Sequence, residues 1–535
     1  MADLLETKQD GVAILTMNRP EARNALSANM LAALLEALPR LAADPEIGAI
    51  IITGSGGAFC AGGDVKGFAA TEGGANHGRS PEQASYSLRQ NMEVSRWLHD
   101  MPKITIAAIP GAAAGAGLSI ALACDFRIAA KGDGVTASGR FAWGAAPGDL
   151  LLADGTLQPG PHHVTPPCRH FGRCGGCQLQ QLDEETLAQF VEARVGNASS
   201  AQELGAELIA PPHLSPPGSR RRASLRAESS AGRVVIGYRE ARSHRLVELA
   251  ECPVLRPELV AVLAPLRGLL IRLGQGQNKP KAKGRHVHAK MAADIELTLT
   301  DQGVDLGIKG LSAEGLALTE AMLDFARDHG LARLTLDGGY GPDVVWEPEP
   351  VTMTLAGVPV PFPPGSFLQA TADGETALVA AAREWLAGCP TVADLFSGLG
   401  TFAFALAGPG TKVLAAEAAR DAHLACKTAA GAAGLPVHSL HRDLFRNPLL
   451  AEELNRFAAV LLDPPRAGAR EQVERIAESA VARVVYISCN PASWAKDART
   501  LVEAGFVLKE LRPVGQFRWS THVELASLFV RGEKP

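Results

Sequence analysis

The sequence predicts an α/β protein of several domains, the last of which is a doubly wound parallel sheet. Its 535 residues are too many for one ordinary domain. In residues 393–530, each short apolar segment is followed by a loop containing Gly, Asp or Pro and then by a helical segment. This order is typical of a parallel sheet with helices on both faces, whose ligands bind at the carboxyl ends of the strands.

The composition is that of a soluble globular protein. Hydrophobic residues make up 47% and charged residues 20% of the chain, with a net charge of -5, which excludes a disordered chain and a general polyanion binder. No run of about 18 apolar residues occurs, and the first residues lack the basic and apolar regions of a signal peptide. We therefore expect a cytoplasmic protein without a membrane partner, in which the nine cysteines are buried thiols, metal ligands or catalytic groups.

Residues 1–130 form the first predicted unit. β-rich segments at 12–17, 47–53 and 104–109 alternate with a helical pattern at 31–41, which indicates a βα arrangement. A Gly/Pro-rich stretch of low periodicity follows and predicts a linker or a small β segment. The predicted domains are 1–130, the linker or small β segment 131–165, a mixed αβ domain 166–360 and the parallel-sheet domain 361–535.

A cysteine cluster marks the second predicted domain. Cys168, Cys174 and Cys177 fall within ten positions of a glycine-rich loop, and Cys252 follows later. Four soft ligands suit zinc or an iron-sulfur cluster, and the spacing alone leaves both open. Three cysteines so close together argue against four unrelated thiols. The cysteines without such neighbours are interpreted as packing residues: Cys60, Cys124, Cys389 and Cys426.

Basic residues are concentrated between these ligands, with Tyr238 among them. Such a stretch can follow an RNA backbone and stack a base on its aromatic ring, whereas the alternative is an ordinary solvated surface. A second basic run, at Lys279, Lys281, Lys283 and Arg285, is interpreted as a loop. The basic residues of the first stretch are Arg220, Arg221, Arg222, Arg226, Arg233, Arg239, Arg242 and Arg245.

Polar residues at successive strand ends of the last domain predict a nucleotide-like ligand. The glycines of 394–401 lie where a strand turns into a helix and let the backbone approach a ligand. Glu417 ends the next strand, where an acid can accept both ribose hydroxyls, and Asp443 follows the third strand and could face an adenine. Asp463 precedes a rigid Pro-Pro pair. No phosphate-binding loop is present, so S-adenosylmethionine fits best.

Cys489 follows the fifth predicted strand of the same domain. A lone cysteine there is ordinarily a packing residue, but the neighbouring strand-end loops favour a nucleophile. Methylation of uracil at carbon 5 needs a thiolate that adds at carbon 6, and then a base that removes the proton from carbon 5. Glu524 is the candidate base, and His522 is interpreted as a loop histidine. The coincidence of Cys489 with Glu524 argues against a noncatalytic RNA-binding module.

These segments together resemble the RNA (uracil-5-)-methyltransferase family. The resemblance implies a Rossmann-like class I methyltransferase domain with Cys489 as nucleophile and Glu524 as base. Thr371 and Thr401 depart from the family pattern, which has Asn at the first position and commonly at the second. The similar segments are Phe367-Leu368-Gln369, residues 394–400, Asp463-Pro464-Pro465-Arg466, Ser488-Cys489-Asn490-Pro491 and His522-Val523-Glu524. The implied S-adenosylmethionine contacts are Gln369, Phe396, Thr401, Glu417, Asp443 and Asp463.

The cysteine pattern resembles the 4Fe-4S ligands of the 23S rRNA members of this family, whereas tRNA members generally lack them. The resemblance therefore implies a 4Fe-4S cluster on Cys168, Cys174, Cys177 and Cys252, expected to be structural, and a uridine of 23S rRNA as the target. The same reaction on tRNA is the alternative. The target uridine must leave its stack, which looped RNA makes easy. We expect a monomer that binds RNA but not DNA.

Residues 1–130 resemble the first half of an enoyl-CoA hydratase/isomerase (crotonase) domain, through segments 18–20, 23–26, 58–64 and 111–125. In that family two backbone donors form an oxyanion hole, and Ala61 and Ala116 stand at those positions. Ser119 replaces a catalytic carboxylate of the hydratases, and the later half is missing, so acyl-CoA hydratase or isomerase activity is only an alternative. Because only half of the domain is present, apolar surface of residues 1–130 is expected to be exposed. The chain is interpreted as a fusion, in which 131–165 could be a truncated TRAM-like segment.

Overall fold

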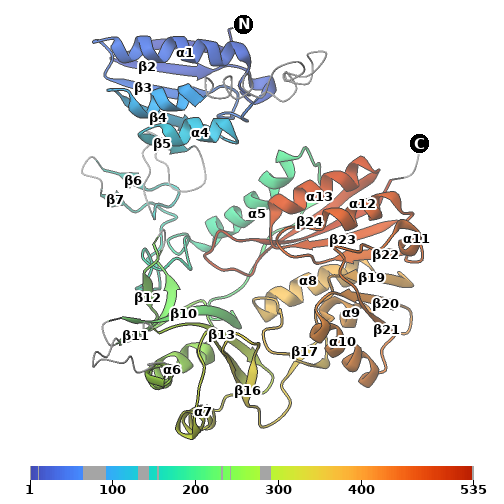
Figure 1. Cartoon of the computed structure of the whole chain (residues 1–535). Coiled ribbons are helices and arrows are strands. Elements are labelled where there is room, and N and C mark those ends of the chain that lie inside the picture. Colours follow the sequence, from blue (N-terminus) through green and yellow to red (C-terminus); the bar gives the residue numbers. More distant parts are fainter. Residues whose placement is uncertain are drawn as a thin grey trace, which may run out of the picture. The chain divides into compact units, whose positions relative to one another are not determined.

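The protein is described from a computed structural model (Figure 1). The chain divides into two compact units, Met1–His163 and Val164–Pro535, which are treated separately below. The finer division at residues 130, 165 and 360 stays a prediction. The structure describes residues 2–9, 11–63, 92–129, 144–152, 156–230, 233–240, 243–276 and 291–532.

The N-terminal unit is built on a sheet with the strand order β1-β2-β3-β4-β5. β1 pairs antiparallel with β2, and the later pairs are parallel. The apolar residues of β2 alternate between buried and half-buried positions, as a strand covered on one face requires. Its elements are β1 (Leu4–Gln9), β2 (Val12–Met17), η1 (Pro20–Ala22), α1 (Ala28–Ala43), β3 (Ala49–Gly54), β4 (Ile104–Ile109), α4 (Ala116–Ala123) and β5 (Phe126–Ala129). A short pair, β6 (Leu150–Leu151) and β7 (Leu157–Gln158), follows.

Large apolar side chains are exposed on this unit, as expected from the sequence. Leu118 and Leu122 lie one turn apart on α4 and are 44% and 60% exposed, and Phe126 on the edge strand β5 is 57% exposed. Buried side chains of α1, including Leu34 and Leu38, fill the core on the sheet. Of the expected linker or TRAM-like segment 131–165, residues 131–143 and 153–155 lie outside the described residues, and β6 and β7 lie in the rest.

The central sheet of the C-terminal unit has the order β12-β11-β10-β13-β14-β15-β16. Its neighbours are antiparallel except β14 and β15, which are parallel. Helices α6 (Pro257–Gly276) and α7 (Leu316–Asp328) lie side by side and share its apolar core (Figure 1). The strands are β10 (Arg222–Ser230), β11 (Arg233–Arg239), β12 (Leu246–Glu248), β13 (Ala292–Thr300), β14 (Gly303–Lys309), β15 (Arg333–Asp337) and β16 (Asp343–Trp346).

The C-terminal sheet has the order β21-β20-β19-β22-β23-β25-β24-β8, with β9 also paired to β24. The pairs from β21 to β23 are parallel, and β25 is antiparallel to β23. The predicted doubly wound sheet is therefore confirmed, and its order reverses between β19 and β22, where such sheets bind ligands. Its strands are β8 (Leu208–Ile209), β9 (His213–Leu214), β19 (Thr391–Leu395), β20 (Lys412–Glu417), β21 (Val437–His441), β22 (Ala459–Leu462), β23 (Arg483–Ser488), β24 (Phe506–Gly515) and β25 (Glu524–Arg531).

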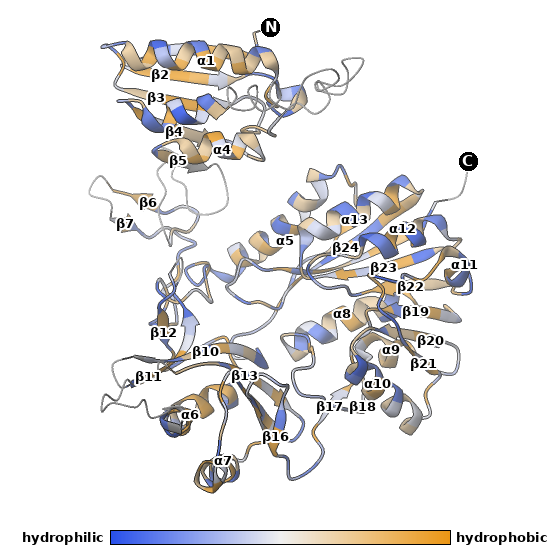
Figure 2. Ribbon diagram, viewed as in Figure 1, coloured by the Kyte–Doolittle hydropathy of each residue, from blue (hydrophilic) through white to orange (hydrophobic). Residues whose placement is uncertain are grey.

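Helices cover both faces of this sheet, and Figure 2 shows the apolar strands between more polar outer helix surfaces.

A separate hairpin, β17 (Thr352–Leu355) with β18 (Val358–Pro361), packs beside helices of this sheet. No helix of the described part of the chain is long and apolar enough to cross a membrane. The helices are α8 (Ala372–Trp385), α9 (Thr401–Leu406), α10 (Arg420–Ala432), α11 (Ala451–Leu454), α12 (Arg470–Glu478) and α13 (Pro491–Glu503).

The segment before the central sheet joins the C-terminal sheet. Helix α5 (Glu184–Ala201) buries Val191 and Val195 in the same core as α13, and β8 and β9 pair with β24. This part lies within the predicted domain 166–360, whose bounds stay a prediction. The apolar face of α5 packs here because α13 and β24 offer it an apolar surface.

Candidate active site

Three of the predicted residues lie at one edge of the sheet, two after the carboxyl ends of parallel strands and one at the start of an antiparallel strand. β22 ends one residue before Asp463, and β23 ends one residue before Cys489. β25 runs antiparallel to β23 with Leu525 opposite Ser488, so its first residue, Glu524, lies beside Cys489. Residues that are far apart in the sequence therefore meet at one edge of the sheet.

The Cys489 thiol is half-buried and protonated near neutral pH. Burial raises its pKa to about 11, and the carboxylates of Glu524 and Asp463 contribute to the rise, whereas the Arg466 guanidinium lowers the pKa. The thiolate is the nucleophilic form, so the proton has to leave before the sulfur can react.

Glu524 and Asp463 are acids whose pKa values lie near neutrality. Burial raises the pKa of Glu524 to about 8, and the charge of Asp463 adds to the rise, while a hydrogen bond from Gln516 opposes it. Burial also raises the pKa of Asp463 to about 7, against a hydrogen bond from Gln369. Two buried carboxyl groups at short range disfavour double ionisation. A carboxyl group in this pKa range can accept a proton at physiological pH.

Gln516, which no sequence motif singled out, connects these carboxyl groups. Its Nε2 donates to Gln369 Oε1 at 2.8 Å and to Glu524 Oε2 at 2.8 Å, and its Oε1 accepts the N–H of Ala370 at 3.0 Å. Gln369 Nε2 in turn donates to Asp463 Oδ2 at 3.2 Å. The expected cofactor residue Gln369 is thus hydrogen-bonded within the same network as the expected base.

The loop after β19 has the backbone conformation that its glycines allow. Gly398 and Gly400 have φ of 54° and 94°. A Cβ atom on Gly400 would lie 2.8 Å from the Phe404 ring and 2.9 Å from Cys426 Sγ, so only glycine fits, and Cys426 is a packing residue as predicted. Thr401 follows as the first residue of α9.

Asp394 is buried, and no side chain among the described residues hydrogen-bonds its carboxylate, whose pKa only the backbone N–H of Ala403 lowers. Burial raises its pKa well above the usual value, and the charges of Asp463 and Glu417 contribute. Such a group is costly unless a ligand donates hydrogen bonds or positive charge to it. The carboxylate therefore fits a site for a ligand with an amine or other donors.

The remaining expected cofactor residues surround this loop. Glu417 accepts the N–H of Gly398 at 2.9 Å, and the Phe396 ring packs on the Phe445 ring with centroids 5.3 Å apart. Asp443 follows β21, the next strand, and accepts the N–H of Phe445 at 3.0 Å. Both carboxylates are held by backbone donors that fix their direction.

Thr371 has a structural role that explains its departure from the family pattern. It begins α8 as its N-cap, accepting the N–H of Gly374 at 3.1 Å, and its hydroxyl also bonds Ser215 Oγ at 2.9 Å. A hydroxyl serves a helix N-cap as an amide does.

The four predicted ligand cysteines, Cys168, Cys174, Cys177 and Cys252, line one cavity of about 60 Å³. Burial raises the pKa of Cys168, Cys174 and Cys177, in the last case to about 12, and the charges of the neighbouring cysteines contribute. Among the described residues, no group of three or more His, Cys, Asp or Glu side chains is arranged to hold a metal ion. The structure thus brings the four thiols to one cavity but does not by itself establish a metal centre.

Comparisons with known proteins agree with this geometry. The family model for tRNA (uracil-5-)-methyltransferase matches residues 440–531, which include Asp463, Cys489 and Glu524. An uncharacterized RNA methyltransferase of Zymomonas mobilis is 47% identical over 405 residues, which cover 76% of this chain and 98% of the relative. The chain belongs to the RNA (uracil-5-)-methyltransferase family. A 23S rRNA (uracil(1939)-C(5))-methyltransferase, RlmD of Pectobacterium atrosepticum, is 33% identical over 70% of this chain and 82% of the relative.

A solved structure of the same fold is that of the tRNA (uracil-54, C5)-methyltransferase of Pyrococcus abyssi. It is 20% identical, with a TM-score of 0.56, over 73% of this chain and 94% of that one. The family model for enoyl-CoA hydratase/isomerase matches residues 7–148. This match confirms that the N-terminal part resembles an enoyl-CoA hydratase/isomerase; in the sequence it precedes the methyltransferase part.

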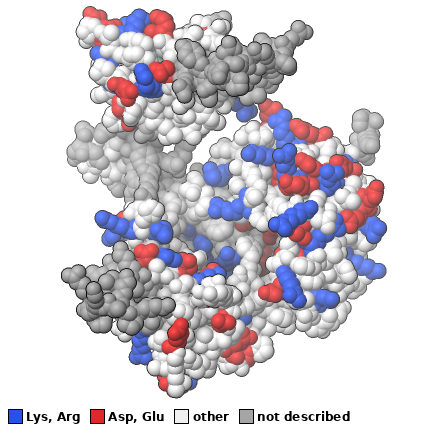
Figure 3. Space-filling model, viewed as in Figure 1, with Lys and Arg blue, Asp and Glu red and all other residues white. Residues whose placement is uncertain are grey.

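Two arginines of the first basic stretch of this methyltransferase, Arg221 and Arg222, bond to the loop that carries Gln369. Arg221 is buried, and donates to Glu375 Oε2 at 2.6 Å and to the carbonyl of Gln369 at 3.1 Å. Arg222 donates to the carbonyl of Leu368 at 2.7 Å. These two arginines hold the loop that carries Gln369, because a buried guanidinium requires acceptors. Figure 3 shows basic and acidic side chains interspersed over much of this unit.

The other members of that stretch differ in their surroundings. Tyr238 packs beside Gly176 and lines the cysteine cavity, and the predicted base-stacking role for its ring stays a prediction. Arg226 is paired with Asp294 at 2.8 Å. Arg220 lies over the Phe517 ring, 5.7 Å from its centroid, near the catalytic strand ends. Arg233, Arg239 and Arg245 are exposed, whereas Arg242, Lys279, Lys281, Lys283 and Arg285 lie outside the described residues.

His522 serves as a partner of Arg466. Its Nδ1 accepts from Arg466 Nη2 at 2.8 Å, and burial together with the neighbouring arginines lowers its pKa. A neutral imidazole can accept this hydrogen bond, which agrees with its interpretation as a loop histidine.

The crotonase-like part lacks one expected donor of an oxyanion hole. The N–H of Ala61 donates to the carbonyl of Arg23 at 3.0 Å, so the prediction for Ala61 is wrong. Asn24 explains this arrangement, because its buried amide donates to Ser55 and Ala58 carbonyls at 2.8 Å each and holds the loop there. Ala116 is the first residue of α4. Among the described contacts, the Ser119 hydroxyl on that helix donates to the carbonyl of Gly115, one turn earlier, at 3.4 Å.

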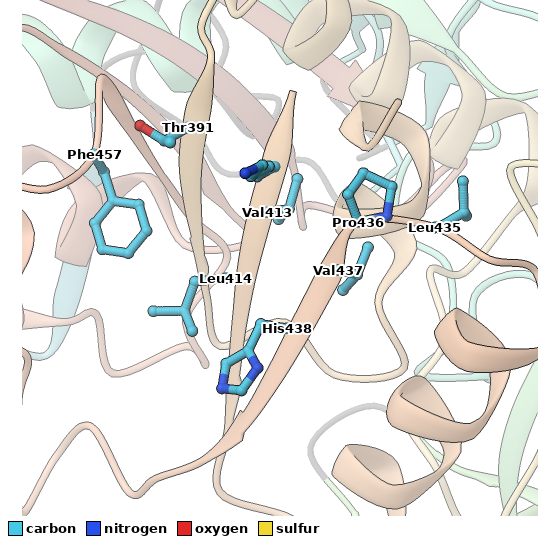
Figure 4. Close-up of a pocket in the computed structure, with 9 residues that line it drawn as sticks. Thr391, Val413, Leu414, Leu435, Pro436, Val437, His438 and Phe457 are labelled. Carbon is cyan, nitrogen blue, oxygen red and sulfur yellow. The ribbon is translucent and has the colours of Figure 1, made fainter. Parts of the chain in front are cut away.

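An open pocket of about 420 Å³ lies at the other end of the C-terminal strands (Figure 4). Thr391 and Val437 begin β19 and β21, and with Leu414 and Phe457 they line this largely apolar hollow. Strand ends of this kind are distant from the carboxyl ends that carry Cys489, so the pocket is not the catalytic site of the methyltransferase.

Proposed function

We propose that the chain transfers a methyl group from S-adenosylmethionine to carbon 5 of a uridine in 23S rRNA through a covalent adduct with Cys489. The observation that supports this most is the position of Cys489 beside Glu524, at the strand ends where parallel sheets bind ligands. A thiol and a carboxyl group with a pKa of about 8 are the two groups that this chemistry needs.

Each residue has one task in the reaction. The Cys489 thiol first releases its proton to solvent. The thiolate then adds to carbon 6 of the uracil ring, and the electron pair of the 5,6 double bond moves into an enolate that makes carbon 5 nucleophilic. S-adenosylmethionine supplies an electrophilic methyl group. Glu524 then accepts the proton from carbon 5, the double bond between carbons 5 and 6 forms again, and the thiolate leaves. Arg466, which lowers the pKa of Cys489, favours the thiolate before addition and after release.

The cofactor would be held at the ends of β19 to β22. The buried Asp394 carboxylate, to which no side chain among the described residues donates a hydrogen bond, supports this assignment because an ammonium group would satisfy it. We assign the direct contacts to Gln369, Phe396, Thr401, Glu417, Asp443 and Asp463.

We also propose that Cys168, Cys174, Cys177 and Cys252 hold a 4Fe-4S cluster with a structural task. Four thiols around one cavity fit the ligand set of such a cluster. Methyl transfer to uracil requires no electron, so no catalytic step depends on the cluster. Iron and sulfide analysis of anaerobically purified protein should find about four of each per chain; stoichiometric zinc without iron would overturn the assignment.

The choice of RNA rests on the relative that acts on 23S rRNA, which is 33% identical. Unmodified 23S rRNA and tRNA should be compared as substrates, with Cys489→Ala as the inactive control and Glu524→Gln expected to accumulate a protein-RNA adduct. Methylation of tRNA alone would contradict the rRNA assignment, and full activity of Cys489→Ala would contradict the mechanism. We expect the methyltransferase part to act in the cytoplasm as a monomer.

A further inference from the structure

The Gln516 side chain contacts both Glu524 and the loop that carries Gln369. It follows the last residue of β24 and is only 1% exposed. Its amide makes three hydrogen bonds, to Ala370, Gln369 and Glu524. A buried amide with this many partners is held in one orientation.

These hydrogen bonds also determine which end of each amide faces which partner. The N–H of Ala370 is a donor, so the Gln516 atom 3.0 Å from it is the oxygen. Nε2 of Gln516 therefore uses its two hydrogens for Gln369 Oε1 and Glu524 Oε2, at 2.8 Å each. Gln369 is left with its own Nε2 toward Asp463 Oδ2 at 3.2 Å. Gln516 thus donates an N–H to Glu524 and Gln369 donates one to Asp463, and each hydrogen bond favours the ionised form of the carboxyl group that accepts it.

We propose that Gln516 is a positioning residue that orients the Glu524 carboxylate to accept the proton from carbon 5 and favours its ionised form. This inference rests on the proposed function. In the step concerned, the bond between carbon 5 and hydrogen breaks and the proton passes to Glu524. The electron pair forms the double bond between carbons 5 and 6, and the bond from carbon 6 to sulfur breaks with its pair returning to Cys489.

Glutamine has the chemistry that this position needs. A carboxylate at 516 would add a negative charge beside Glu524 and raise its pKa further. A hydrocarbon side chain would remove the donor to Glu524 and leave the N–H of Ala370 without its acceptor. Because Gln516 also holds Gln369, the base is connected to the loop expected to bind the cofactor.

The test compares Gln516→Leu and Gln516→Glu with wild type and with Gln472→Leu in the full chain. Gln472 is a suitable matched control, because it is also a buried glutamine, in α12, and its amide bonds the backbone of Leu449 at 2.8 and 3.1 Å. Single-turnover reactions with 23S rRNA tritiated at carbon 5 measure tritium release, and denaturing gels measure the methylated protein-RNA adduct.

For the Gln516 variants, tritium release should slow by about ten- to a hundredfold, which is part of the roughly 10²–10⁴-fold that a general base supplies. The adduct should accumulate, KM for RNA should change less than about threefold, and the rate of Gln516→Leu should reach its plateau at higher pH. Gln472→Leu should lower thermal stability without these effects.

Several outcomes would overturn the inference. A folded Gln516→Leu chain with wild-type rates and no adduct would overturn the inference about Gln516. It would leave the proposed function intact, because wild type would still methylate RNA. Equal kinetic defects in Gln516→Leu and Gln472→Leu would reduce Gln516 to a structural role. If Gln516→Leu fails to fold, Gln516→Glu decides by the same measurements. No methyl transfer by wild type would overturn the proposed function together with this inference.

Discussion

Replacement of Gly400 by alanine tests the packing of the loop after β19. Two costs are expected. The left-handed backbone, with φ of 94°, disfavours a side chain by about 1–2 kcal/mol. The new methyl group would also lie 2.8 Å from Phe404 and 2.9 Å from Cys426 Sγ, which adds about 1–3 kcal/mol for overpacking. Gly398→Ala is the matched control, because its φ of 54° carries the first cost while nothing lies within 4 Å of the added atom.

Thermal unfolding of the two variants under the same conditions would separate these costs. A difference of about 2 kcal/mol corresponds to roughly 4–8 °C in Tm for a domain of this kind. Gly400→Ala should unfold at the lower temperature, and Cys426→Ala added to it should restore part of the loss. Equal Tm values for Gly398→Ala and Gly400→Ala would refute the reasoning, as would a neutral Gly400→Ala.

Three further predictions follow from buried groups. Glu524→Gln should raise Tm more at pH 8 than at pH 5: folding raises the pKa of Glu524 to about 8, so the wild-type chain loses stability as pH rises from the unfolded value of 4.5 toward 8; an equal gain at both pH values would contradict this. Arg221→Met should destabilise the chain by about 3–5 kcal/mol by leaving Glu375 buried and unpaired, and Glu375→Gln added to it should recover part, as denaturation of the three variants would reveal. Cys177→Ser should lose iron where Cys389→Ser, outside the cysteine cavity, keeps it.

Strand ends were the part of the site that the sequence made predictable. Asp463 and Cys489 each follow an apolar strand, and parallel strands bring such ends to one edge whatever their spacing in the chain. Glu524 could be placed beside them because it stands at the start of the last strand. The same reasoning located the loop with Gly398 and Gly400.

Side chains whose role depends on burial could not be interpreted from the sequence. Gln516 lies in no motif, and its importance comes from one hydrogen bond to Glu524 and two to the distant segment of Gln369 and Ala370. Arg221 and Arg222 read as part of a basic surface, but their acceptors, such as Glu375 and the carbonyl of Leu368, belong to a segment about 150 residues later. Charge in a sequence does not indicate which face of the chain a side chain will occupy.

The pairing of β8 and β9 with β24 has a consequence for synthesis of the chain. These strands leave the ribosome well before β24, their partner near the carboxyl terminus. Val191 and Val195 on the preceding helix therefore stay exposed to solvent while the central sheet is being translated. A nascent chain stopped before residue 506 would keep this apolar helix exposed, and chaperones would encounter an unfinished enzyme until its last strands arrive.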